Sequence, residues 1–126
     1  MKTKPGTERV AKGLIADDDA RMRKAIRSMV QDLAREIYEA ADGREAVEAY
    51  RQHQPGWVTL DLAMSPVDGW TALYEIKAGD PLACIVIVTA HDTEAFRQAA
   101  RLAGACAYVL KDDLSKIRDA IAPAHR

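Results

Sequence analysis

The sequence lacks the features that mark several classes of protein. Its net charge is only −1, from 18 basic and 19 acidic residues, so it has none of the excess positive charge typical of nucleic-acid binders. No hydrophobic run approaches the roughly 20 residues that cross a bilayer, and no apolar stretch follows Lys2 and Lys4 to form a signal peptide. We therefore expect a cytoplasmic protein that has no membrane segment and does not itself bind nucleic acid.

Cysteine is also scarce, with two residues, Cys84 and Cys106, and no CxxC motif. Both lie in apolar stretches that predict strands, so we expect reduced, buried and chemically inert thiols. Cys84 lies five residues before Thr89, and Cys106 lies five before Lys111. If those two strands are neighbours with level ends, the two thiols lie side by side.

What the sequence does contain is a regular alternation of apolar strands and amphipathic helices. Its 126 residues suffice for one domain. Periodicity predicts five strands, at residues 11–16, 36–41, 57–62, 83–89 and 105–110, and a helix after each of them. Strands joined through helices form a parallel sheet with right-handed crossovers and helices on both faces. The predicted fold class is therefore α/β, a three-layer sandwich.

Polar residues predict where helices begin, and apolar spacing predicts their inner faces. Asp19 is placed to cap the first helix, and Asp92 or Thr93 the fourth. The first helix is predicted to continue to Leu33. The inner face of the third helix is predicted to comprise Trp70, Leu73, Tyr74 and Ile76. The basic residues of the first helix are interpreted as a solvated face: Arg21, Arg23, Lys24 and Arg27.

Polar side chains gather where the predicted strands end: Asp17 and Asp18, Asp61, Thr89 and Lys111. In an open parallel sheet these ends share one edge, where ligands bind. Two like charges about 4 Å apart cost on the order of 4 kcal/mol at an effective dielectric near 20, so three carboxylates together require a cation. Ligands that are all oxygen favour Mg²⁺, with Mn²⁺ as a substitute, over Zn²⁺.

This set of residues also suits phosphoryl chemistry. A carboxylate can attack phosphorus to give an aspartyl phosphate, while a metal ion, a lysine and a hydroxyl stabilise the phosphoryl oxygens. The chain carries four motifs, which are Asp17-Asp18, Asp61-x-x-Met64 with Asp68-Gly69, Val88-Thr89-Ala90 and Tyr108-Val109-Leu110-Lys111. Together these motifs resemble the receiver domains of two-component response regulators, the CheY-like superfamily. The resemblance runs from about Gly13 to Ile121, and it implies a flavodoxin-like sheet with strand order 2-1-3-4-5.

The resemblance also implies a role for each residue of the site. Asp61 is expected to be the phosphoacceptor, and Lys111 to pair with the phosphoryl group. Mg²⁺ would be bound by Asp18, Asp61 and the backbone carbonyl of Ala63, with Asp17 acting through a water. Thr89 and Tyr108 would switch the face formed by the fourth helix, fifth strand and fifth helix. Ala63 and His91 are candidate modulators of phosphate lifetime.

The expected partners are those of such a receiver. They are a sensor histidine kinase or histidine phosphotransfer protein, and a target protein or effector domain; a phosphorylation-dependent homodimer is also considered. The basic face of the first helix is an alternative docking surface for the histidine-bearing partner. The expected organisation is a flexible tail at residues 1–11, a receiver domain at 12–122 and a C-terminal end at 123–126, without an effector domain. The chain is thus either a single-domain regulator or a fragment.

Two positions depart from the family pattern. Ser65 stands where the family usually has proline, with Pro66 next, and Asp112 stands where proline usually follows the lysine. Because a cis bond before a residue other than proline costs about 3–4 kcal/mol, Lys111–Asp112 is expected to be trans. A Lys-Asp pair also resembles receivers of the NarL/FixJ type.

These departures leave two alternative functions open beside the phosphoaccepting receiver, which itself acts on no separate small-molecule substrate. One is a degenerate receiver that serves as a protein-binding scaffold. The other is a phosphatase with an aspartate nucleophile, disfavoured because the sequence has neither a cap domain nor a glycine-rich phosphate loop.

Overall fold

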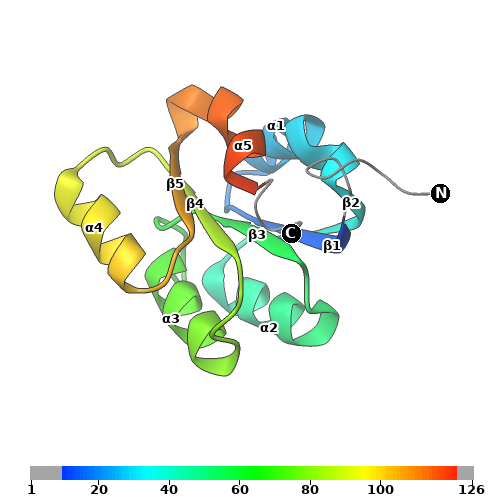
Figure 1. Ribbon diagram of the computed structural model, residues 1–126, viewed down its shortest axis with the longest axis horizontal. Coiled ribbons are helices and arrows are strands. Elements are labelled where there is room, and N and C mark those ends of the chain that lie inside the picture. Colours follow the sequence, from blue (N-terminus) through cyan, green and yellow to red (C-terminus); the bar gives the residue numbers. More distant parts are fainter. Residues whose placement is uncertain (1–9, 122–126) are drawn as a thin grey trace.

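The structure, a computed structural model, describes residues 10–121 as a five-stranded parallel sheet in the order β2-β1-β3-β4-β5 (Figure 1). The strands are β1 (Val10–Ala16), β2 (Ala34–Ala40), β3 (Trp57–Leu60), β4 (Ile85–Thr89) and β5 (Ala107–Leu110). The predicted fold class and strand order are therefore confirmed. The predicted tail and C-terminal end fall mostly outside the described residues, and β1 begins two residues inside the predicted tail.

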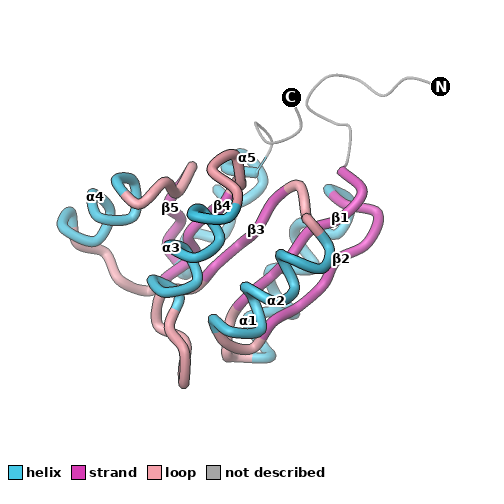
Figure 2. The backbone as a smooth tube through the Cα atoms, turned by 90° about the horizontal axis from the view of Figure 1, so that it is seen from below, coloured by secondary structure: helices cyan, strands magenta, loops and turns pink. Residues whose placement is uncertain are grey.

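Helices cover both faces of the sheet (Figures 1 and 2). Each face has its own hydrophobic core. On one face lie α1 (Ala20–Val30) and α5 (Ile117–Ile121), whose Ile26 and Ile117 pack against Ile15, Val86 and Val109. On the other face lie α2 (Gly43–His53), α3 (Gly69–Gly79) and α4 (Glu94–Leu102). No helix within residues 10–121 is long and apolar enough to cross a membrane.

The central strands are buried on both faces, as parallel strands between two helical layers must be. All residues of β3 and β4 are buried, and β4 is made of Ile and Val before its terminal Thr89. By contrast, the edge strand β2 has both termini buried and exposed or half-buried residues between them. The core therefore fixes the strands whose ends carry Asp61 and Thr89.

Several predicted boundaries and faces are corrected by the structure. The first helix ends at Val30, and Leu33 lies in a separate 3₁₀ turn at residues 31–33. The side chain of Tyr74, predicted to face inward, is 57% exposed, and Ala72 is buried in its place. Periodicity failed here because α3 has apolar residues on more than one side.

The predicted helix caps are largely confirmed. Asp19 Oδ1 accepts a hydrogen bond from the backbone N of Arg21 at 2.9 Å. Of the two candidates for α4, Thr93 is the cap, and its hydroxyl accepts from the backbone N of Phe96 at 3.1 Å. Helix α5 is preceded by a 3₁₀ segment, Lys111–Lys116, which is interrupted at Asp113.

The cysteines are adjacent but are not core residues. Each stands one residue before its strand, β4 or β5, and Cys84 is half-buried while Cys106 is exposed. Their sulfur atoms are 2.9 Å apart. The predicted adjacency is confirmed, and the predicted burial is wrong because the ordered strands begin two residues later than the apolar stretches.

Candidate functional site

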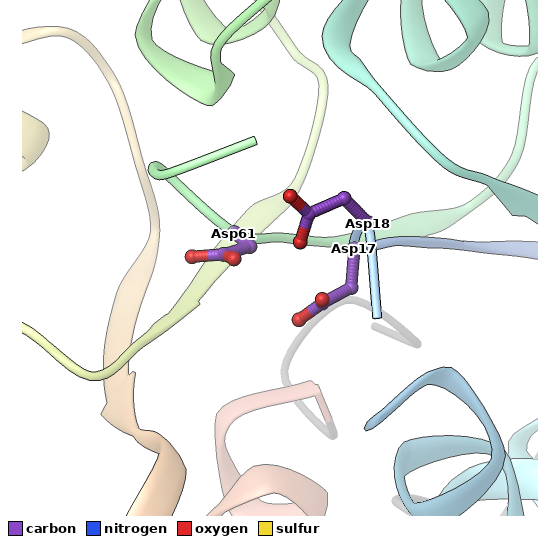
Figure 3. Close-up of side chains that lie close together, drawn as sticks. All are labelled: Asp17, Asp18 and Asp61. Carbon is purple, nitrogen blue, oxygen red and sulfur yellow. The ribbon is translucent and has the colours of Figure 1, made fainter. Parts of the chain in front are cut away.

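The backbone of the central strands brings three carboxylates together at one edge of the sheet (Figure 3). Asp17 directly follows β1, and its N donates to the carbonyl of Ala40 at 3.0 Å. Asp61 directly follows β3, and its N donates to the carbonyl of Ala16 at 3.0 Å. One carboxylate oxygen from each of Asp17, Asp18 and Asp61 lies within 4.8 Å of the others. The expected convergence of the three acids is thus confirmed as geometry.

Lys111, the residue after β5, supplies a positive charge to this cluster. Its Nζ lies 3.0 Å from Oδ2 of Asp61, with hydrogen-bond geometry, and 3.0 Å from Oδ2 of Asp17. Burial lowers the pKa of the ammonium, but its contacts with the two carboxylates outweigh this effect, so the pKa of Lys111 is raised. One ammonium beside three carboxylates leaves an excess of two negative charges when all are ionised.

Asp17 has a buried carboxylate oxygen that lacks a hydrogen-bond partner. It is fully buried, and its Oδ2 makes a charge contact with Lys111 but has no partner with hydrogen-bond geometry. Burial raises the pKa of Asp17, the hydrogen bond from Asp19 N and the close contact with the Lys111 ammonium lower it, and the charge of Asp61 raises it further, for a net increase. A buried carboxylate oxygen beside two other acids fits a hard divalent cation such as Mg²⁺.

The loop from Asp61 to Gly69 is held close to the sheet. Asp61 Oδ1 accepts from the backbone N of Ala63 at 3.2 Å, and the N of Gly69 donates to the carbonyl of Leu62 at 3.0 Å. A Cβ at Gly69 would lie 1.9 Å from the backbone oxygen of Asp61, so a side chain is excluded there. Among the described residues the cis peptide bond is Ser65–Pro66, and Lys111–Asp112 is trans as expected.

The remaining predicted residues form a separate chain of contacts beside the acids. Thr89 is fully buried, and its hydroxyl accepts from the backbone N of His91 at 3.4 Å. The hydroxyl of Tyr108 donates to the backbone oxygen of His91 at 2.8 Å. The His91 ring is exposed and packs edge-on against Phe96, with centroids 5.0 Å apart. His91 thus links Thr89, the last residue of β4, to Tyr108 on β5.

Two arginines have structural roles that the sequence interpretation missed. Arg97, on α4, lies 4.9 Å from the ring centre of Tyr108 and pairs with Asp92 at 3.1 Å; opposite charges five residues apart at a helix start were an available signal. Arg23, predicted to be solvated, donates to the backbone oxygen of Asp17 at 2.7 Å and pairs with Glu39 at 2.9 Å. Arg23 therefore supports the backbone of the acid cluster.

Comparisons with known proteins agree with this geometry. Residues 14–122 match the sequence model of the response regulator receiver domain. The chain is 39% identical over 99 residues to the chemotaxis protein CheY of Bacillus subtilis, covering 78% of this chain and 82% of that protein. A crystal structure of the CheX–CheY–BeF₃–Mg²⁺ complex from Borrelia burgdorferi matches with a TM-score of 0.85 and 26% identity, covering 98% of this chain and 99% of that one. A LuxR-family response regulator from Aurantimonas matches with a TM-score of 0.79 and 31% identity, covering 90% and 86%.

Proposed function

The chain belongs to the response regulator receiver domain family, and from this premise we propose that residues 12–122 form a phosphoaccepting receiver that takes a phosphoryl group onto Asp61. The observation that carries the proposal is the contact of Lys111 Nζ with Oδ2 of both Asp61 and Asp17, at 3.0 Å each, beside a third carboxylate. A nucleophile, a neutralising cation and ligands for a metal ion thus lie within one site.

In the proposed reaction, a carboxylate oxygen of Asp61 attacks the phosphorus of a phosphohistidine on a partner protein. An O–P bond forms, the P–N bond breaks, and the imidazole nitrogen keeps the electron pair and takes up a proton. The ammonium of Lys111, which contacts Asp61 before the reaction, then forms an ion pair with a phosphoryl oxygen. The Thr89 hydroxyl donates to another phosphoryl oxygen once it leaves the backbone N of His91.

The residues that would hold Mg²⁺ are Asp18, Asp61 and the backbone carbonyl of Ala63, with Asp17 acting through a bound water. The bound ion would neutralise charge that develops on the phosphoryl oxygens. Mn²⁺, which accepts the same oxygen ligands, is expected to substitute. The presence of BeF₃ and Mg²⁺ in the Borrelia burgdorferi complex supports this assignment.

We propose that Thr89 and Tyr108 couple phosphorylation of Asp61 to a conformational change at the output face. Because both bond to the backbone of His91, a shift of the Thr89 hydroxyl toward a phosphate changes the segment that anchors Tyr108. The output face comprises α4, β5 and α5, and a groove of about 340 Å³ between α4 and β5 is lined by Arg97, Arg101 and Tyr108 among others. Phosphorylation then biases this face by favouring one of two states.

His91 and Ala63, both exposed beside the site, are proposed to set the phosphate lifetime.

The proposed phosphoryl donor is a sensor histidine kinase or a histidine phosphotransfer protein in the cytoplasm. The output is binding to a target protein, to an effector domain or to a second phosphorylated copy. The pairing of CheY with CheX in the Borrelia burgdorferi complex supports a protein as the target.

The proposal is tested by incubating the chain with Mg²⁺ and acetyl phosphate and measuring the mass of the intact protein by mass spectrometry. We expect a gain of one phosphoryl group in the wild type and in Asp92→Asn, a matched carboxylate change outside the acid cluster. We expect none in Asp61→Asn, or after chelation of the metal.

The alternatives predict other results. If neither phosphorylation nor beryllofluoride binding occurs, the chain is a scaffold and the proposal fails. Rapid, continuing release of phosphate from a small phosphoester would instead identify a phosphatase with an aspartate nucleophile.

A further inference from the structure

Two free cysteines lie together at the opposite end of the sheet from the acids. Cys84 and Cys106 immediately precede β4 and β5, which lie side by side (Figure 1). The backbone fixes both positions, since the carbonyl of Cys84 accepts from Val58 N at 2.9 Å and the N of Cys106 donates to the carbonyl of Ile85 at 2.9 Å. The acids follow the other ends of the strands, so the thiols are independent of the phosphorylation chemistry.

The sulfur atoms are placed for bond formation. They are 2.9 Å apart, and a disulfide requires about 2.05 Å, so they need to approach by less than 1 Å. Cys106 is exposed and Cys84 is half-buried. A small oxidant can therefore reach the thiol of Cys106 more easily than that of Cys84. The exposed residue can therefore react first and the sheltered one second.

The surroundings make the two thiols chemically unequal. A hydrogen bond from Cys84 lowers the pKa of Cys106 to about 7; burial opposes this effect, and the charge of Lys77 contributes to it. The pKa of Cys84 is raised by the same hydrogen bond and by burial. Lys77 is held in place because its Nζ donates to the carbonyls of Pro81 and Ala83 at 2.6 and 3.0 Å. Cys106 is thus the more readily ionised of the two thiols, and it is the one that would react as a thiolate.

We propose that Cys84 and Cys106 form an oxidation site, a dithiol that a peroxide converts into an intramolecular disulfide joining the N-terminal ends of β4 and β5. The pair is suited to this role by its contact distance, by the exposure of one sulfur and by the neighbouring ammonium.

The chemistry balances with a peroxide as the two-electron oxidant. The Cys106 thiolate attacks one peroxide oxygen, the O–O bond breaks, and the departing hydroxide takes a proton to become water, leaving a sulfenic acid. The sulfur of Cys84 then attacks the sulfur of Cys106, and an S–S bond forms as the S–O bond breaks. The departing hydroxide combines with the thiol proton of Cys84. Overall, two thiols and one hydrogen peroxide give one disulfide and two waters.

The disulfide would close a ring through residues 84–106. That ring contains β4, Thr89, His91 and the whole of α4. Cys106 also lines the groove between α4 and β5, together with Arg97 and Tyr108. Oxidation would therefore restrain the unfolded chain and fix one side of the proposed output face.

To test the proposal, the full chain is treated with an equimolar amount of hydrogen peroxide, and the remaining thiols are blocked by alkylation. The protein is then digested without reduction, and its peptides are mapped by mass spectrometry. We expect one cross-linked peptide joining Cys84 and Cys106, a loss of two hydrogens from the intact mass, and a rise in melting temperature of roughly 10 °C. A dithiol reductant should reverse all three changes.

Single variants separate this mechanism from general oxidation. In Cys84→Ala, peroxide should yield a sulfenic acid on Cys106 that dimedone traps, with no rise in melting temperature. In Cys106→Ala, the remaining thiol should react at least about tenfold more slowly. The proposal is overturned if the wild type keeps two alkylatable thiols, if it forms only cross-links between chains, or if its cysteines oxidise to sulfinic acid without joining.

Discussion

At the scale of single residues, Lys111 is central to the charge balance of the acid cluster. Its ammonium contacts Asp17 and Asp61 at 3.0 Å, and its raised pKa keeps it charged at neutral pH. The same charge that would stabilise a transferred phosphoryl group therefore opposes the approach of a metal cation to the same carboxylates. Removing it should change these two properties in opposite directions.

Lys111→Met should bind Mg²⁺ about tenfold more tightly than the wild type, because a cation–cation repulsion worth a little over 1 kcal/mol is removed. It should also accept phosphate from acetyl phosphate at least about a hundredfold more slowly. Isothermal titration and intact-mass time courses measure the two effects. Lys116→Met, an exposed lysine paired with Asp113, is the control and should change neither. Loss of both metal binding and phosphorylation would contradict the assigned role of Lys111.

Cys106 provides a second test at residue scale, in its pH dependence. Its pKa is lowered to about 7, chiefly by the hydrogen bond from Cys84, so the reactive thiolate forms as the pH rises through this value. The alkylation rate of Cys106 by iodoacetamide should reach half its maximum near pH 7. In Cys84→Ala the midpoint should move upward, toward the ordinary value of a thiol. A midpoint that is the same in both proteins would show that Cys84 does not activate Cys106.

At the scale of elements, the start of α3 positions Asp61, the proposed phosphoacceptor. Asp68 caps the helix by accepting from the backbone N of Thr71 at 2.9 Å, and Gly69 brings the first turn against the backbone of Asp61. The helix start and the end of β3 thus share one close contact, and displacing the helix must displace Asp61.

Gly69→Ala should destabilise the fold by about 2 kcal/mol or more, because its Cβ would overlap the Asp61 carbonyl oxygen. It should also slow phosphorylation by moving Asp61. Gly79→Ala, at the other end of α3, is the matched control: nothing lies within 4 Å of its Cβ, so it should be neutral or stabilise by up to about 1 kcal/mol. Urea unfolding and intact-mass time courses compare the two. Equal effects of both substitutions would refute the close-contact argument.

Much of this element-scale arrangement could be predicted from sequence, because strand patterning and strand-end residues are local signals. The buried β3 and β4, the Asp19 cap and the convergence of Asp61 with Lys111 all follow from such patterns. The outward position of Tyr74 and the exposure of Cys106 could not be predicted in this way. Both depend on where the strand ladder begins and how a helix is rotated against its neighbours, and apolar character alone does not specify these.

At the scale of the whole molecule, the excess negative charge of the acid cluster links metal binding to global stability. A ligand that binds only the folded state raises its stability with ligand concentration. Mg²⁺ at about 100 times its dissociation constant should therefore add about 2.7 kcal/mol to the free energy of unfolding.

Thermal melting with and without Mg²⁺ measures this effect. The melting temperature should rise with Mg²⁺ and return to its starting value after chelation. Asp18→Asn should reduce the shift, because it removes a proposed ligand, whereas Asp119→Asn on α5 should leave it intact. If melting of the wild type is unchanged by Mg²⁺, the three carboxylates do not form a metal site.

The central claim is that Asp61, rather than Asp17 or Asp18, carries the phosphoryl group. The most direct measurement is borohydride reduction of the acetyl-phosphate-treated protein, which converts an aspartyl phosphate to homoserine, followed by peptide sequencing by mass spectrometry. We predict homoserine at position 61 only, and none when Mg²⁺ is chelated before phosphorylation. Homoserine at position 17 or 18, or none at any position, would contradict the account.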